Sequence, residues 1–218
     1  MTSSLEGTRP KILAILRQEA SATVDRLAQD TGLATATVRR HLDILQRDRL
    51  VSFHQLRNGR GRPEFAYSLT EDGLESGQRD YRGLLLLLLG TVRSLDPVDL
   101  AGRAGEDLLQ FLILRMADLT SHAYGDLGQP TSGGPERRIS HLAQALTEGG
   151  FSPELSRENG LVHIRLCNCP FRAAALYEES VCCFDQRLIA NILGVEPVRQ
   201  HTIRNGDTSC SYVAPLEG

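Results

Sequence analysis

The sequence has no tryptophan, only two methionines and 5% aromatic residues, and Lys11 is the one lysine among its 24 basic side chains. Its longest apolar run, Leu84–Leu89, is far shorter than the roughly 20 residues that a membrane-spanning helix requires. Residues 1–16 contain no basic stretch followed by an apolar run and a small-residue cleavage site, so no secretory signal is apparent. We therefore expect a cytoplasmic protein that does not enter the membrane.

Motifs of catalysis are missing as well. Serine, histidine and aspartate are all present, yet no nucleophile elbow, phosphate-binding loop or paired-carboxylate motif organises them. We therefore expect a protein that is not an enzyme.

Cysteine is scarce but unevenly placed. Four of the five cysteines lie between residues 167 and 183, and Cys210 follows downstream. In a reducing cytosol such a group indicates metal binding or redox chemistry rather than a disulfide framework.

The charge of the chain is also unevenly distributed. The 218 residues have a net charge of −3, but residues 1–69 hold eleven basic and seven acidic side chains, a net of +4, which leaves −7 for the remainder. Almost all of the basic residues are arginine, which binds phosphate and guanine in a bidentate manner. A codon bias towards arginine would give the same composition.

Residues 9–49 have the pattern of three short helices. The predicted helices cover 9–19, 23–32 and 34–49, and the second begins at a cap near Thr23 and ends at Gly32. In the third helix the apolar residues share one face, while small and charged residues lie opposite. A helix, a glycine turn and a second helix that begins with small and basic residues indicate a helix-turn-helix, whose second helix enters the major groove of DNA.

Two predicted strands, 50–55 and 64–69, follow around an arginine-rich glycine turn and form a wing that can reach phosphates or the minor groove. We therefore expect double-stranded operator DNA as a partner. The alternatives are that the three helices are a protein-docking module and that the basic turn is only solvated. The expected DNA-binding residues are Thr35, Thr37, Arg39, Arg40, Arg57, Arg60 and Arg62.

The segment from Asp80 to Tyr124 is helical in pattern and rich in leucine. Its run Leu84–Leu89 is apolar all round, which predicts burial on more than one side. We expect these helices to join two protomers into a homodimer, because paired half-sites on DNA require a two-fold protein. The alternative is packing within one chain against the C-terminal domain.

A glycine and proline loop, 125–136, marks the next boundary, and an α+β domain follows it. Helices are predicted near 137–148 and 185–194. Strands are predicted at 151–156 and 161–166 around Asn159-Gly160, and at 199–204 and 209–213 around Asn205-Gly206. The fold class is therefore α+β, with predicted domains at 1–79 (winged helix-turn-helix), 80–124 (dimerisation helices) and 125–218 (sensor).

The cysteines of this last domain lie at strand ends and helix starts. Cys182 and Cys183 precede a predicted helix, whose amide dipoles favour a thiolate and would lower the pKa of a thiol. Three or four convergent thiolates select zinc or an iron–sulfur cluster. An ordinary zinc finger is disfavoured, because the only close sets are Cys167-x-Cys169 and Cys182-Cys183.

Several motifs together resemble the SufR-type regulators, the iron–sulfur-sensing winged helix-turn-helix repressors of cluster-assembly genes. The resemblance covers nearly the whole chain and rests on the order of the motifs and on the steps of 13 and 28 residues from Cys169 to Cys182 to Cys210. The motifs are "TVRRHLDIL", "GRGRPEFAYSLTEDG", "NCPF", "VCCFD", "LIANILG" and "IRNGDTSCSYVAP".

The resemblance implies a [4Fe–4S] cluster in each subunit of a homodimer, held by Cys169, Cys182 and Cys210, with the cluster-loaded form binding the operator. A [2Fe–2S] cluster or zinc is the alternative cofactor. Further candidate ligands, one of which could supply a fourth bond, are Cys167, Cys183, His163, His201 and Asp185. Two other functions stay open: a regulator that uses its thiols directly as a redox or metal sensor, and an iron–sulfur enzyme or scaffold.

Overall fold

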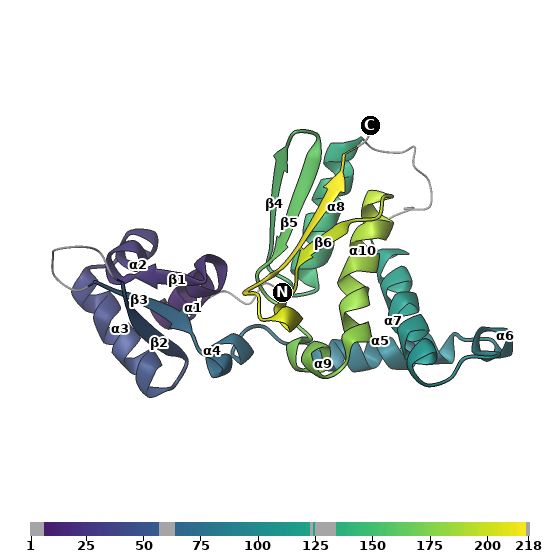
Figure 1. The fold of residues 1–218 in the computed structure, drawn as a ribbon, viewed down its shortest axis with the longest axis horizontal. Coiled ribbons are helices and arrows are strands. Elements are labelled where there is room, and N and C mark those ends of the chain that lie inside the picture. Colours follow the sequence, from purple (N-terminus) through teal and green to yellow (C-terminus); the bar gives the residue numbers. More distant parts are fainter. Residues whose placement is uncertain (1–6, 57–63, 123, 125–133, 217–218) are drawn as a thin grey trace. The chain divides into compact units, whose positions relative to one another are not determined.

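A computed structural model describes residues 7–56, 64–122, 124 and 134–216 (Figure 1). The chain divides into an N-terminal unit, Met1–Gly77, and a C-terminal unit, Gln78–Gly218. The predicted three-part division of the chain stays a prediction, and the helices of 80–124 belong to the same unit as the C-terminal sheet. Three expected DNA-binding residues, Arg57, Arg60 and Arg62, lie outside the described residues.

The N-terminal unit packs three helices against a small sheet. Thr23 caps α2 by accepting a hydrogen bond from the backbone N–H of Arg26, and Gly32 ends that helix with φ 74°, as predicted. The apolar faces of the helices meet in a core that includes Ile12, Leu27 and Leu42, each fully buried. The elements are α1 (Thr8–Glu19), β1 (Ser21–Thr23), α2 (Val24–Thr31), α3 (Thr35–Arg47), β2 (Val51–Leu56), β3 (Glu64–Leu69) and α4 (Glu71–Glu75).

The sheet of this unit has the order β1-β3-β2 and is antiparallel. Strands β2 and β3 pair from Val51 opposite Leu69 to Leu56 opposite Glu64, which confirms the predicted hairpin. The short strand β1 was not predicted, because three residues are too few to give a period-2 pattern.

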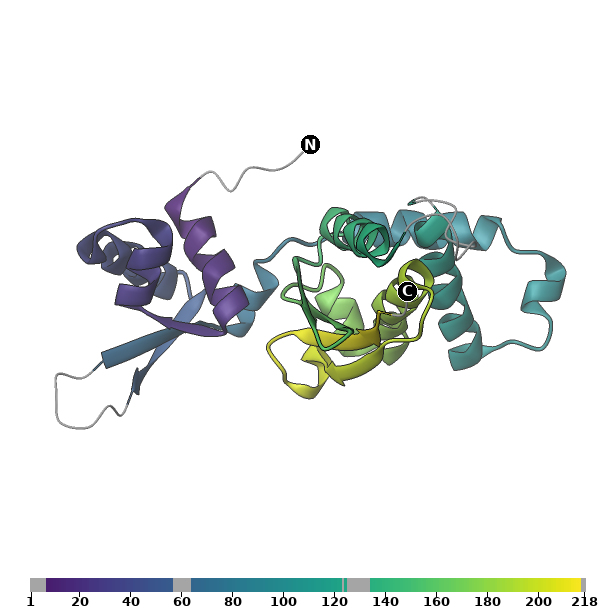
Figure 2. The same cartoon turned by 90° about the horizontal axis from the view of Figure 1, so that it is seen from above.

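The C-terminal unit is a four-stranded antiparallel sheet, order β4-β5-β7-β6, with helices α8 and α10 over one face (Figure 2). Alternate residues of the central strands, such as Val162 and Ile164 of β5 and Tyr212 of β7, point into the core beneath these helices. The elements are α5 (Tyr81–Arg93), α6 (Pro97–Leu100), α7 (Gly105–His122), α8 (Pro135–Glu148), β4 (Pro153–Glu158), β5 (Leu161–Leu166), α9 (Arg172–Tyr177), the 3₁₀ helix η1 (Glu179–Cys182), α10 (Cys183–Leu193), β6 (Val198–His201), η2 (Ile203–Asn205) and β7 (Cys210–Pro215).

The two predicted hairpins of this unit have different outcomes. Asn159 and Gly160 have φ 51° and 76° and connect β4 to β5 tightly, as predicted. The second hairpin is confirmed in its pairing, because β6 and β7 are antiparallel neighbours, but its connection is longer than predicted: β6 ends at His201, and η2 intervenes before β7. Local polar contacts cause this, because the Thr202 hydroxyl caps η2 and the backbone N–H of Thr202 donates to Asp207.

Within the described part of its own unit, helix α5 packs one side against the core, and the predicted burial on more than one side stays a prediction. Three leucines, Leu84, Leu87 and Leu88, pack against the core, while Leu85, Leu86 and Leu89 are 51–57% exposed. Among the described residues, no helix combines the length and apolarity that crossing a lipid bilayer would need.

Candidate functional site

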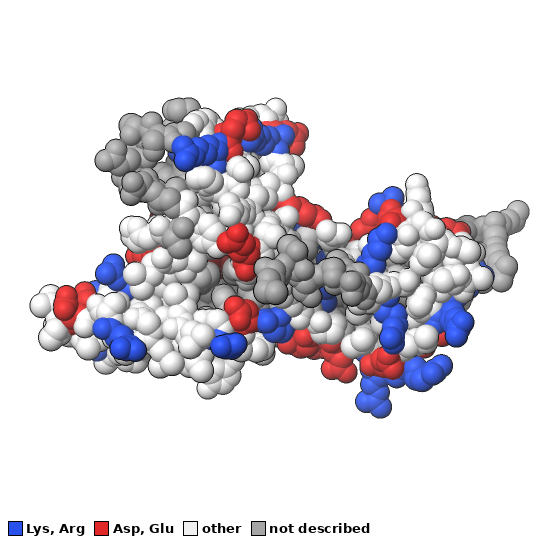
Figure 3. All heavy atoms as spheres, turned by 180° about the vertical axis from the view of Figure 1, so that it is seen from behind, with Lys and Arg blue, Asp and Glu red and all other residues white. Residues whose placement is uncertain are grey.

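The first candidate surface is the outer face of α3. Val38, Leu42 and Leu45 bury the inner face of this helix in the N-terminal core. The four expected DNA-binding residues of α3 are all exposed, namely Thr35, Thr37, Arg39 and Arg40. Figure 3 shows Lys and Arg side chains protruding from this unit, with acidic ones between them.

The two expected DNA-binding arginines of α3 line different hollows. Arg40 shares a shallow one with Thr37 and His41 of α3 and with Arg9 of α1. Arg39 lines a different hollow, together with Asp25 and Glu64. Sequence reasoning did not find Arg9 as a neighbour of Arg40, because Arg9 lies at the start of a different helix and only the packing of α1 on α3 brings it there.

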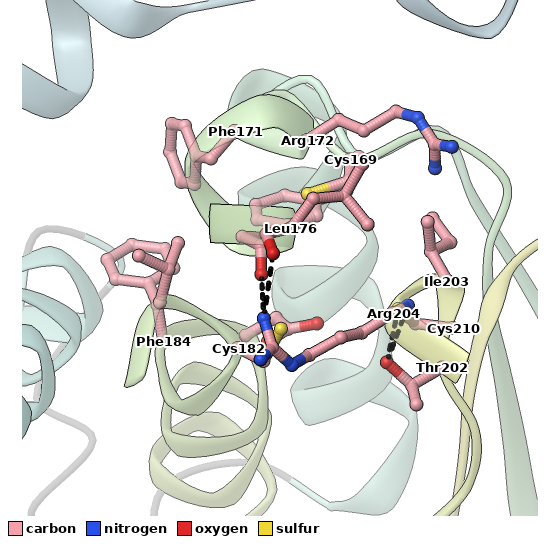
Figure 4. A pocket seen from close by; sticks show the side chains of 14 residues that line it. Cys169, Phe171, Arg172, Leu176, Cys182, Phe184, Thr202, Ile203, Arg204 and Cys210 are labelled. Carbon is pink, nitrogen blue, oxygen red and sulfur yellow. Dashed lines mark hydrogen bonds between the residues drawn. The ribbon is translucent and has the colours of Figure 1, made fainter. Parts of the chain in front are cut away.

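The second candidate site is a narrow cavity of about 20 Å³ in the C-terminal unit (Figure 4). Cys169 lies in the loop after β5, Cys182 ends η1 immediately before α10, and Cys210 begins β7. All three line this cavity. The rest of the wall is mostly apolar and comes from Phe151, Phe171, Ala175, Leu176, Val181, Phe184 and Ile203, with the polar residues Arg172, Asp185, Thr202 and Arg204.

The other ligand candidates have different positions. Cys167 is buried and Cys183 half-buried, but neither lines the cavity. His163, on β5, lines a separate hollow on the other face of the sheet, and the exposed His201 lies 3.5 Å from Asp207. Asp185 is the only one of the five additional candidates that lines the cavity, and it is buried.

The thiols are predominantly protonated in the metal-free protein. Burial, followed by the charge of Asp185, raises the pKa of Cys169 and of Cys182 to about 12, and burial also raises the pKa of Cys210. For Cys182 this corrects the expectation that the start of α10 favours a thiolate. Burial is the largest cause, because it disfavours the charged thiolate.

Two arginines, Arg199 of β6 and Arg204 of η2, donate hydrogen bonds to backbone carbonyl groups of residues that line the cavity. Arg204 donates hydrogen bonds to the carbonyl oxygens of Ala175 (2.9 Å) and Leu176 (3.0 Å), so it ties η2 to α9. Arg199 donates to the carbonyl oxygen of Cys182, and both guanidinium charges act to lower the pKa of that thiol. Their positive charge would offset the negative charge of any thiolate-bound group.

The donor set fits an iron–sulfur cluster in chemical type. Three cysteine sulfurs from separate elements, in an apolar wall with positive charge nearby, are the ligands and surroundings that such clusters use. No three or more His, Cys, Asp or Glu side chains within the described part of the chain are arranged to hold a single metal ion. In a cluster each ligand binds a different iron, so the ligands need not converge on one point.

Comparison with known proteins identifies the domain that carries the first of these two candidate sites. The model of a winged helix-turn-helix DNA-binding family matches residues 5–52, which include α1, α2 and α3. The chain matches no curated protein, and it matches no solved structure. The N-terminal unit therefore carries a winged helix-turn-helix DNA-binding domain, the domain of a DNA-binding transcription regulator.

Proposed function

We propose that this protein is a homodimeric repressor of iron–sulfur cluster assembly genes that senses a [4Fe–4S] cluster bound by Cys169, Cys182 and Cys210. One observation carries the proposal: of five cysteines, these three line one apolar cavity, and they are the three that the motif resemblance selects. The winged helix-turn-helix domain supplies the DNA-binding half of the function.

The three thiols would hold the cluster, and the cluster would supply a cross-link between elements that are otherwise joined by weaker contacts. A cavity of about 20 Å³ is only about the size of one water-sized probe, so its walls must separate to accept a cluster. The contacts of Arg204 with α9 are the ones that such an opening would change. The domain would therefore adopt different packing with and without its cofactor.

Packed elements connect this cavity to the dimerisation helices. Both η1 and α10, which carry Cys182 and its neighbours, pack against α7, and α7 packs against α5. Polar contacts hold the interface between α7 and α10. Asp118 of α7 accepts hydrogen bonds from Arg187 (2.7 Å) and Asn191 (2.8 Å) of α10. A shift at the cysteines would thus alter the position of α5, and in a dimer it would alter the spacing of the two recognition helices.

An exposed apolar stripe on α5 supports the homodimer. Leu85, Leu86, Leu89 and Val92 are each 49–57% exposed, and their spacing places them along one side of the helix. A second copy of the same helix would bury this stripe, and a two-fold pair is what two DNA half-sites require.

The test is anaerobic purification with iron and sulfide analysis, followed by binding to DNA upstream of cluster-assembly genes. A brown, air-sensitive protein with absorbance near 400 nm is expected, and its affinity for that DNA should fall when a chelator removes the cluster. Unrelated DNA of the same length is the control. Colourless protein with stoichiometric zinc, or colourless metal-free protein whose DNA binding responds to peroxide, would overturn the cluster in favour of a zinc or thiol sensor.

A further inference from the structure

The wall of the cysteine cavity contains a buried carboxylate, Asp185, whose position the apolar core does not explain. The residue is only 7% exposed, and it belongs to the first turn of α10, three residues after Cys182. A carboxylate at this position of a helix can interact favourably with the free amides without being buried. Burial adds a desolvation cost that this role does not require.

The contacts of Asp185 hold it in place and leave capacity for another partner. The Tyr212 hydroxyl donates to its Oδ2 atom at 2.8 Å, and the backbone amides of Asp185 and Gln186 also act as donors. An ionised carboxylate has about four acceptor positions, so these three donors leave about one for a further ligand.

The surroundings of Asp185 favour a cation as that ligand. The same cavity wall carries Cys169, Cys182 and Cys210, and the charge of Asp185 acts on all three thiols. No salt bridge of Asp185 occurs among the described residues, and Arg199, whose charge acts on Asp185, makes its hydrogen bond to the Cys182 carbonyl. A cubane has four irons, so three cysteines leave one iron without a protein ligand.

We propose that Asp185 is the fourth protein ligand of the cluster, giving a set of three thiolates and one carboxylate; this assignment rests on the proposed function. The carboxylate binds one iron through the acceptor position that its hydrogen bonds leave free, and Tyr212 holds the other oxygen. An oxygen ligand makes this iron different from its three sulfur-bound neighbours and easier to extract. Such an iron is suited to a sensor, which must lose its cluster when conditions change.

The first measurement uses the wild-type protein, so it does not depend on any variant folding. The full chain is reconstituted anaerobically with ⁵⁷Fe and sulfide and examined by Mössbauer spectroscopy. The expected spectrum has one iron with a larger isomer shift than the other three. Four equivalent irons would overturn the Asp185 assignment, whereas a protein that binds neither iron nor sulfide would overturn the proposed function itself.

The second measurement compares two variants with a matched control. Asp185→Asn keeps the shape of the side chain but is a poor ligand, so it should lose iron to a chelator about tenfold faster or more. Asp185→Cys should restore slow loss and remove the distinct iron, a rescue that a helix-capping role does not predict. Asp107→Asn, an exposed aspartate of α7 that does not line the cavity, is the control and should resemble the wild type. Equal rates of iron loss in Asp185→Asn and in the wild type overturn the assignment.

Discussion

The Tyr212 hydroxyl of β7 donates a hydrogen bond of 2.8 Å to the Oδ2 atom of Asp185 in α10, and both residues are buried. Burial, followed by the charge of Asp185, raises the pKa of Tyr212, so the hydroxyl remains protonated and remains a donor across the neutral and moderately alkaline range. This contact joins the C-terminal strand to the helix that begins beside Cys182. It therefore connects β7, which carries Cys210, to the helix that follows Cys182.

The first prediction concerns this hydrogen bond. Tyr212→Phe keeps the ring in the core but leaves a buried carboxylate oxygen without its donor, so the free energy of unfolding of the metal-free protein should fall by about 1–3 kcal/mol. Urea denaturation followed by circular dichroism measures it. Tyr124→Phe is the control: it removes the exposed contact with Glu148 and should leave the unfolding midpoint nearly unchanged. An equal decrease in the free energy of unfolding in both variants would show that the buried hydrogen bond stabilises the protein no more than the exposed one.

The second prediction concerns the cysteines. Serine at Cys169, Cys182 or Cys210 should abolish the cluster, because each thiol comes from a different wall of the cavity and two thiolates hold a cubane poorly. Cys167→Ser and Cys183→Ser should keep full iron and sulfide, because neither side chain lines the cavity. Iron and sulfide content per chain, measured after anaerobic purification, decides between these outcomes. Cluster loss in Cys183→Ser with retention in Cys182→Ser would shift the ligand assignment by one residue.

The third prediction is a pH dependence of thiol reactivity. The pKa of Cys169 and of Cys182 is raised to about 12 by burial, whereas an unfolded cysteine has a pKa near 8.5. In the metal-free protein both thiols should therefore react slowly with iodoacetamide at pH 8, and faster as the pH rises towards 12. The folded state prefers the protonated thiols, so the stability that they contribute is complete below pH 8.5 and is lost between there and pH 12.

Mass spectrometry of the alkylated peptides, against a urea-unfolded control, measures these rates. Fast alkylation of Cys182 in the folded protein at pH 7 would instead favour the direct thiol sensor, because the thiolate is the reactive form.

Local patterns in the sequence predicted most of the elements, but only tertiary packing determines the candidate site. Asn159-Gly160 fixes its hairpin by backbone conformation alone, so that turn was predictable. The start of α10 was predictable too, but the pKa of Cys182 was not, since desolvation depends on which residues close over the thiol. Asp185 and His201 were equivalent candidates in the sequence. They differ only in where the fold places them, one inside the cavity and the other exposed beside Asp207.

The fourth prediction concerns the DNA-binding face. Arg40→Ala should weaken specific operator binding by about 1–3 kcal/mol if its guanidinium contacts a base edge, and it should weaken binding to unrelated DNA much less. The side chain is exposed on α3 and outside the N-terminal core, so the unfolding midpoint should not change. Fluorescence anisotropy with operator and unrelated duplexes at fixed salt measures both affinities. Arg157→Ala, an exposed arginine of β4 outside the DNA-binding domain and outside α5, is the control. Operator affinity as high in Arg40→Ala as in this control would exclude the proposed docking of α3.

The fifth prediction separates dimerisation from cluster binding. Leu89→Arg places a charge in the middle of the exposed stripe of α5, where burial against a second copy would leave the charge unpaired, so the variant should be a monomer. Leu89 is 51% exposed within the chain and the cysteine cavity lies elsewhere, so iron and sulfide content should stay at the wild-type level. Val198→Arg is the matched control, because Val198 is 66% exposed on β6, away from α5, and should leave the protein dimeric. Sedimentation velocity gives the oligomeric state.

Operator binding completes this test. A monomer engages one half-site at a time, so Leu89→Arg should lose most of its operator affinity even with its cluster in place. A cluster-loaded dimer in this variant would exclude the α5 stripe as the dimer interface. A cluster-loaded monomer that still binds the operator as tightly as the wild type would instead exclude half-site spacing as the means by which the cluster controls DNA binding.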